Sequence, residues 1–189
     1  MSKILSFFSK LKILVILFIT ILIFNFFIFP YSINYCNSSL CNKTRIRSLD
    51  TSFVYSSKEI ISYIQSKSYS QRKCIAILHL TIDTIYPIIY TIFLLSLLYL
   101  ITNKIKLPDK LKNVSYIFPF IIIISDYIEN LLIVVLLSCI KEKISNSNIL
   151  LAKILPFITT IKWIFAGMTI LMILGTILIF WFKKNRTMQ

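Results

Sequence analysis

The chain has 189 residues, of which 57% are hydrophobic, and its mean hydropathy is +0.82. This composition excludes an ordinary soluble domain, and the presence of only 2 Gly and 5 Pro excludes a loop-rich or low-complexity protein. The net charge of +14 would suggest a nucleic-acid partner in a soluble protein, but here the basic residues lie mainly at the ends of apolar segments. We therefore expect them to set membrane topology and to attract lipid headgroups, with no nucleic-acid partner.

Four apolar segments are long enough to cross about 30 Å of hydrocarbon at about 1.5 Å per residue. They cover approximately residues 13–30, 74–101, 114–140 and 149–182. The sequence thus predicts a single-domain, all-α integral membrane protein, built as a four-transmembrane-helix bundle. The first segment follows lysines and ends in bulky residues without a small-x-small cleavage site, which favours an uncleaved signal anchor.

The first connection, residues 31–73, is the sizeable extramembrane segment. Within it, Ser56 and Glu59 match a capping box, and apolar residues follow at helical spacing. We expect a short amphipathic helix in this first loop, which lies on the membrane surface or caps the bundle. The later connections, near residues 103–113 and 141–148, are short, which predicts antiparallel neighbours.

The orientation follows from where the basic residues lie. Four spans place both termini on the same side, and a simple count of Lys and Arg gives ten on each side of the membrane. The basic start of the chain and the densely basic second connection favour cytoplasmic termini, so we predict a bacterial inner-membrane protein with both termini in the cytoplasm.

The cysteines fall close to the ends of the predicted spans. Cys36 and Cys41 flank a short polar stretch after the first span, and we expect a disulfide between them if that loop lies outside the cytoplasm. Cys74 and Cys139 lie near the ends of the second and third spans, where we expect buried thiols. The chain has no Cys-x-x-Cys pair, which argues against a thiol oxidoreductase.

The second span carries a polar stripe. His79, Asp83, Tyr86 and Tyr90 are separated by four, three and four residues, so they share one helix face. Ionisable side chains at membrane depth are costly and indicate a functional site. Pro87 frees the carbonyl of Asp83 from its helical hydrogen bond. The freed carbonyl is either a ligand for a cation or a polar headgroup, or it has no special role, because proline is ordinary in membrane helices.

The third and fourth spans add further polar residues at similar depth. Asp126, Glu129 and Asn130 stand at i, i+3 and i+4 on one face, and Lys162 lies inside the fourth span. We expect all of them roughly 13–21 Å below one membrane surface. The carboxylates either share a proton, pair with Lys162 or His79, or hold a cation or a substrate hydroxyl, or else they form an interhelical polar clamp. A single His excludes a His-rich metal site, and we expect neither a resident metal nor a cofactor.

Three motifs carry a family resemblance. The stretches Thr81–Tyr90 (TxDxxxPxxY), Asp126–Asn130 (DxxEN) and Lys162–Trp163 resemble a group of small, uncharacterised four-span bacterial membrane proteins. That resemblance implies a fold but no activity. The chain is more weakly similar to the four-span sterol-isomerase and sigma-2-receptor-like superfamily, which implies a lipid-sized cavity with acidic residues. Asp83 and Glu129 would occupy comparable positions there.

Three functions fit these patterns. The favoured one is an acidic pocket that binds, and in one version transforms, a lipid or isoprenoid-like molecule. The second is proton- or ion-coupled transport, for which four spans would need a homo-oligomer, and the third is a non-catalytic assembly subunit. No Gly-rich phosphate loop, nucleophile elbow or zinc-binding His pair is present, so the question of catalysis stays open. The candidate ligand-binding residues are His79, Asp83, Tyr86, Tyr90, Asp126, Glu129, Asn130 and Lys162.

Overall fold

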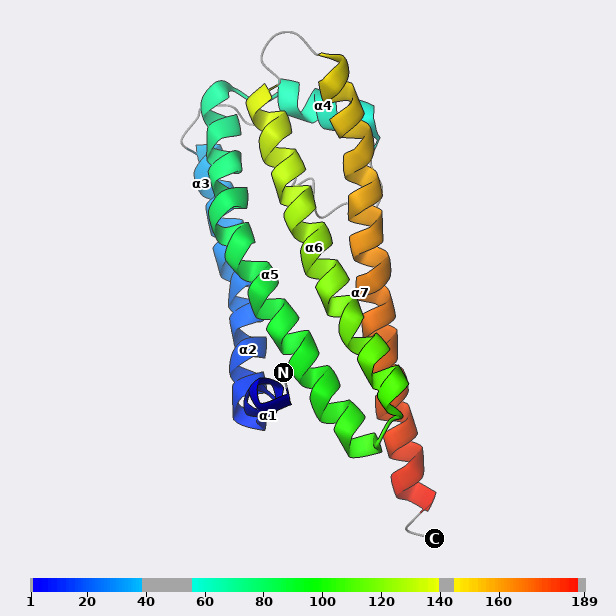
Figure 1. Cartoon of the computed structure of the whole chain (residues 1–189). Coiled ribbons are helices and arrows are strands. Elements are labelled where there is room, and N and C mark those ends of the chain that lie inside the picture. Colours follow the sequence, from blue (N-terminus) through cyan, green and yellow to red (C-terminus); the bar gives the residue numbers. More distant parts are fainter. Residues whose placement is uncertain (1, 39–55, 140–144, 187–189) are drawn as a thin grey trace.

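The computed structural model describes residues 2–38, 56–139 and 145–186, and over these residues it contains no strand. The elements are α1 (Ser2–Phe8), α2 (Leu11–Ile23), η1 (Phe24–Ile28), α3 (Phe29–Ser38), α4 (Ser57–Gln65), α5 (Tyr69–Ile105), α6 (Asp109–Cys139) and α7 (Asn146–Arg186). Four helical spans are long and apolar enough to cross a membrane. The chain is thus an all-α multi-pass bundle, as predicted, with α5, α6 and α7 running side by side (Figure 1).

The first span is a helix in three parts. α2 leads into η1, a π-helical turn in which the N–H of Phe29 donates to the carbonyl of Phe24, and α3 then continues through Ser38. The helix does not end at Pro30, where the apolar run predicted its boundary. A π turn accommodates one extra residue, and this one lies directly before the proline, at the place where a regular helix would lose a hydrogen bond.

A tight turn joins α5 to α6. α5 begins at a capping box formed by Ser68 and Gln71. After its last residue, Ile105, the left-handed conformation of Lys106 (φ 55°) directs the chain into α6. The short connections therefore make antiparallel neighbours, as predicted. The outer faces of the bundle expose large apolar side chains, among them Leu131 and Leu171, as expected of helices that face lipid.

The predicted amphipathic helix is α4, and it caps the bundle. The Ser56 hydroxyl accepts from the N–H of Glu59 at 3.2 Å, and the Glu59 carboxylate accepts from the N–H of Ser56 at 2.6 Å. Behind this capping box, Ile60 and Ile64 are completely buried. They belong to the upper cluster, which consists of Ile60, Ile64, Ile75, Ile133, Leu136, Leu137, Ala152 and Leu155. Figure 1 shows α4 lying crosswise over this end.

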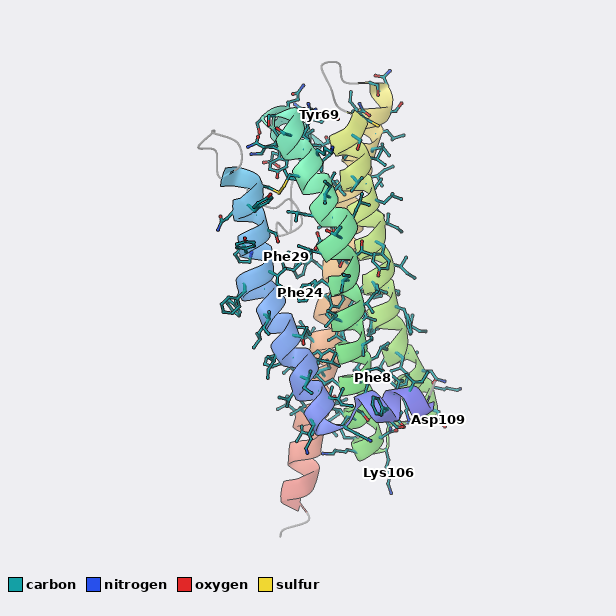
Figure 2. All side chains as sticks on the ribbon, turned by 90° about the vertical axis from the view of Figure 1, so that its left-hand side faces the viewer. Phe8, Phe24, Phe29, Tyr69, Lys106 and Asp109 are labelled. Atoms are coloured by element: carbon teal, nitrogen blue, oxygen red, sulfur yellow. A yellow bond between two sulfur atoms is a disulfide. The ribbon has the colours of Figure 1, made fainter. Side chains whose placement is uncertain are left out.

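A second apolar cluster closes the opposite end of the bundle. The short helix α1, which the sequence did not predict, crosses this end and buries Leu5 against α5 (Figure 2). The lower cluster consists of Leu5, Leu95, Leu98, Ile101, Ile105, Tyr116 and Ile173. The middle of the bundle, between the two clusters, is where the polar residues of the spans lie.

The disulfide differs from the predicted one. Cys36 is bonded to Cys74, with a Cα–Cα distance of 5.7 Å, so it does not pair with Cys41, which lies outside the described residues. The reason is that α3 carries Cys36 inside its helix, on the face that packs against α5. Cys74 is therefore no buried thiol, and Cys139, the free cysteine of the described residues, is exposed rather than buried. The bond links the upper ends of the first span and α5 (Figure 2).

Candidate functional site

Polar side chains from α5, α6 and α7 meet in the middle of the bundle. The polar network consists of His79, Asp83, Tyr90, Asp126, Glu129, Asn130, Thr159 and Lys162. On each helix its members lie between the two apolar clusters. From the upper end of each helix, a residue of the upper cluster comes first, then the polar residues, then a residue of the lower cluster. These are Ile75, residues 79–90 and Leu95 on α5; Ile133, residues 126–130 and Tyr116 on α6; and Leu155, residues 159–162 and Ile173 on α7. These residues therefore lie at a common level along the bundle.

The innermost part of the network is an ion pair. Glu129 is completely buried, and its carboxylate accepts from the ammonium of Lys162. The hydroxyl of Thr159 donates to the other carboxylate oxygen, Oε1, at 2.6 Å. Breaking such a pair by removing one partner is costly because it leaves a buried charge, so these three residues hold α6 and α7 together.

Asp126 connects this ion pair to α5. Lys162 Nζ also donates to Asp126 Oδ1 at 3.0 Å, and the phenol of Tyr90 donates to Asp126 Oδ2 at 2.7 Å. The predicted pairing of the α6 carboxylates with Lys162 is thus confirmed, while Tyr90 contributes a hydrogen bond as well as packing. One carboxylate joins three helices, and its side chain keeps 13% exposure in the described structure.

A second group of polar residues links α5 and α6 higher in the bundle. His79 Nδ1 lies 2.7 Å from Asp83 Oδ2 and 3.0 Å from Asn130 Oδ1. The amide nitrogen of Asn130 donates to the backbone carbonyl of Asp83 at 3.1 Å, so its oxygen is the atom that faces the imidazole. Both neighbours of Nδ1 are acceptors, and Nδ1 therefore carries a proton.

The proline of α5 explains one of these bonds. Pro87 cannot donate to the carbonyl of Asp83, and Asn130 supplies the missing donor. The phenol of Tyr127 donates to the neighbouring carbonyl of Thr84 at 3.0 Å. The freed carbonyl at Asp83 is thus occupied by a side chain of α6, which is a packing role rather than the ligand role that the sequence left open.

A cavity of about 700 Å³ lies beside the polar network. Its wall comes from all four spans and is mostly apolar. The lining residues are Ile21, Asn25, Phe29, Pro30, Ile33 and Asn34 of the first span; Asp83, Tyr86, Tyr90, Phe93 and Leu94 of α5; Ile122 and Asp126 of α6; and Lys162, Trp163, Ala166 and Ile170 of α7. This volume is in the range of small-molecule sites in proteins.

The cavity divides the predicted site residues into two groups. Asp83, Tyr86, Tyr90, Asp126 and Lys162 line the wall. The other three candidates, at positions 79, 129 and 130, are buried behind that wall and bond to residues that line it. The first group is therefore placed to contact a ligand, and the second group positions the first.

The first span contributes residues that the sequence did not assign to the site. Asn25 Nδ2 donates to the phenol of Tyr86 at 2.7 Å, and the rings of Phe24 and Phe29 pack against Tyr86 at centroid distances of 5.5 and 5.1 Å. The π turn carries both Phe24 and Asn25 and so fixes how this part of the span faces α5. An Asn inside an otherwise apolar run was the available signal.

The site has an excess of acidic groups. Three carboxylates (Asp83, Asp126 and Glu129) stand against the single ammonium of Lys162 and the imidazole of His79. The formal sum is −2 with a neutral imidazole and −1 with an imidazolium. Anionic groups are therefore disfavoured near this wall, while hydrogen-bond donors find acceptors there.

The arrangement offers hydrogen bonding and proton transfer at an apolar cavity. Among residues 2–38, 56–139 and 145–186, no three His, Cys, Asp or Glu side chains gather closely enough to hold a metal ion. No protein-family model, curated protein or solved structure matches this chain.

Proposed function

We propose that this protein binds a lipid or isoprenoid-like small molecule in its intramembrane cavity. The observation that carries the proposal is the position of the cavity-lining charges. Asp83, Asp126 and Lys162 stand at the wall of a mostly apolar cavity, and along the long helices the apolar upper and lower clusters lie between these three residues and the two ends of the bundle. A ligand that is mainly apolar but carries a polar group suits such a site.

The ligand reaches the cavity sideways, from the lipid. The first span packs chiefly against α5, yet its side chains share the cavity wall with those of α7. The span is also the least buried of the four, since only 6% of its most apolar window is buried. The boundary between the first span and α7 is accordingly the weakest part of the wall and the route of access.

The two clusters also weigh against the other candidate functions. Transport of protons or ions needs a polar path to both surfaces, whereas buried Ile and Leu side chains separate the network from each end. An assembly subunit would present its polar face to another protein, whereas the network residues bond to one another across helices of the same chain. Binding from the lipid needs neither a polar path nor a partner.

We further propose that the termini are cytoplasmic and the membrane is a bacterial inner membrane. The Cys36–Cys74 bond lies at the upper end, and disulfides persist in oxidising compartments outside the cytoplasm. The lower end carries the basic α5–α6 turn, with Lys104, Lys106 and Lys110. Positive charge favours the cytoplasmic side, so both features support the same orientation.

Mass spectrometry of the protein in native-lipid nanodiscs tests the binding proposal. Ala166 lines the cavity, so Ala166→Phe places a ring in the cavity space. Gly167→Phe is the control, because it places the same ring at the neighbouring exposed position, where an added Cβ meets no atom within 4 Å. We expect one specific molecule to copurify with the wild type and with Gly167→Phe, and to be lost from Ala166→Phe. Bulk lipid in equal proportions in all three samples would overturn the proposal.

A further inference from the structure

Two of the three carboxylates in the polar network are fully paired. Glu129 accepts from Lys162 and from Thr159, with one bond to each oxygen. Asp126 accepts from Lys162 through Oδ1 and from Tyr90 through Oδ2. Two acids thus share one ammonium, so this part of the network keeps a net negative charge, and the charge of Lys162 is already offset without a ligand.

Asp83 is the carboxylate with an open acceptor. Its Oδ2 lies 2.7 Å from Nδ1 of His79, whereas none of the residues that the structure describes donates to its Oδ1. The imidazole also faces Asn130 Oδ1 at 3.0 Å, so its proton is shared between two acceptors. The side chain of Asp83 lines the cavity and keeps 13% exposure. Its remaining hydrogen-bonding capacity is therefore left for a ligand.

The charge balance at this wall favours one sign of headgroup. Three carboxylates against one ammonium sum to −2 with a neutral imidazole and to −1 with an imidazolium. In a water-poor cavity charges are weakly screened, so an anionic head is repelled and a cationic head is attracted. A neutral hydroxyl would donate to the open acceptor but would leave the negative charge in place. A cationic head both donates to Asp83 and offsets the charge.

Aromatic rings stand at the same end of the cavity. Tyr86 follows Asp83 by three residues on the same face of α5, and the ring of Phe29 packs against Tyr86 at a centroid distance of 5.1 Å. The negative face of an aromatic ring attracts cations, and the attraction is stronger where water is excluded. The ammonium of Lys162 already makes such a contact in this site, 5.8 Å from the ring of Trp163.

The rest of the cavity wall is apolar. Along α5 the lining residues change from Asp83 to Phe93 and Leu94 over about ten residues, which corresponds to about 15 Å of helix. On α7, Ala166 and Ile170 line the part of the wall that lies toward the lower cluster. A ligand that fills the cavity therefore carries its charged head at one end of an apolar body.

We infer that the ligand is a cationic amphiphile, a protonated hydrophobic amine whose ammonium donates to Asp83 and packs against the rings of Tyr86 and Phe29. Its chain or ring system fills the apolar part of the cavity. This inference rests on the proposed function, because it names the chemical class that the same cavity binds. It assigns Asp83 as the residue that determines headgroup specificity, and Ala166 as a residue that limits the space for the apolar body.

Tryptophan fluorescence in nanodiscs gives a direct test. Trp163 lines the cavity, and the chain has only one other tryptophan, Trp181, so Trp181→Phe makes Trp163 the sole reporter. The protein in phosphatidylcholine nanodiscs is titrated with dodecylamine, dodecanol and dodecanoic acid at matched mole fractions of lipid. At about pH 8 the amine is protonated and the acid is ionised. The shared chain makes headgroup chemistry the difference between the probes, and the zwitterionic bilayer has no net charge that would concentrate one of them.

We expect saturable binding of dodecylamine, about tenfold tighter than that of dodecanol or dodecanoic acid, which is the scale of one charge-assisted hydrogen bond. Asp83→Asn should remove this preference and keep the binding of dodecanol, because the amide retains an acceptor but lacks the charge. Asp109→Asn removes a carboxylate outside the cavity and should keep the preference. Ala166→Phe should weaken the binding of dodecylamine about tenfold, with Gly167→Phe unchanged.

The outcomes separate the two proposals. If dodecanol or dodecanoic acid binds as tightly as dodecylamine, or if Asp83→Asn keeps the preference for the amine, the inference is overturned, and the binding cavity stands when Ala166→Phe weakens that binding. If binding is saturable but equal in Ala166→Phe, the probes occupy another place and the assigned cavity is wrong. If no probe gives a saturable signal, the inference is overturned, and the proposed function falls with it when no specific molecule copurifies. The comparison of the three probes on the Trp181→Phe protein decides the inference even where a further variant does not fold.

Discussion

Replacing Lys162 by Met should destabilise the protein strongly. The substitution removes the ammonium that lies 3.0 Å from Asp126 and also contacts Glu129, a side chain with no exposure at all. Breaking a buried ion pair by removing one partner costs about 3–5 kcal/mol, compared with about 0–1 kcal/mol for an exposed pair. We therefore expect the free energy of unfolding in mixed micelles, measured by SDS titration, to fall by about 3–5 kcal/mol. Lys153→Met, at an exposed position of the same helix, should leave it unchanged.

The double variant tests the physical reason. In Lys162→Met/Glu129→Gln, the buried position 129 is neutral and its amide oxygen still accepts from Thr159. Because the uncompensated charge is gone, we expect the double variant to be about 2 kcal/mol more stable than the sum of the two single changes implies. Additive single effects, or a cost below about 1 kcal/mol for Lys162→Met, would show that the pair is solvated and that the reasoning is wrong.

Three further predictions concern the upper end of the bundle. Cys36→Ser or Cys74→Ser removes a bond that closes a sequence separation of 38 residues, so unfolding under non-reducing conditions should cost about 2–4 kcal/mol less than for the wild type, and equal stability would mean that the bond is absent. Replacing Ile64, a completely buried residue of α4, by Ala should lower the free energy of unfolding by about 2–5 kcal/mol in the same titration. Replacing it by Val should lower that free energy by only about 0.5–1.5 kcal/mol, and equal losses would contradict its core position. The backbone N–H and the hydroxyl of Ser56 hold the pKa of Glu59 below its ordinary value of 4.5, so this stabilisation is present above that pH and is lost as pH falls through the lowered pKa. The protection factors of the α4 amides, measured relative to intrinsic exchange at each pH, should therefore fall in acid for the wild type but not for Glu59→Gln, which keeps the capping box without titrating, and an equal fall would contradict the assignment.

The fold was largely predictable because its main signals are local. Span lengths follow from runs of Ile, Leu and Phe, and the start of α4 follows from the spacing of Ser56 and Glu59, which the structure confirms as a capping box. The elements that the sequence did not predict depend on less local physics. α1 is only seven residues long and is held by the burial of Leu5 against α5, and the extension of the first helix past Pro30 depends on a π turn.

The site was predictable as a set of residues but not as a set of bonds. Helical spacing placed the polar side chains on common faces, but spacing does not give the rotation of one helix against another. That rotation decides that Tyr90 donates to Asp126 and that Asn130 bonds to the carbonyl of Asp83. It also decides the partner of Cys36, because its helix turns the sulfur toward α5 rather than along the chain.

The energetics of the network help to separate a binding site from an interhelical clamp. Apolar residues of similar volume hold helices together at least as well as buried ion pairs do, so a clamp alone gives no reason for charges at this depth. A clamp also gives no reason for the cavity of about 700 Å³ beside them. Glu129, wholly buried behind Lys162, has the position of a clamp residue, whereas Asp83 and Asp126 keep 13% side-chain exposure and line the cavity. Under the proposed function, an occupant that bonds to these two carboxylates accounts for both the charges and the space.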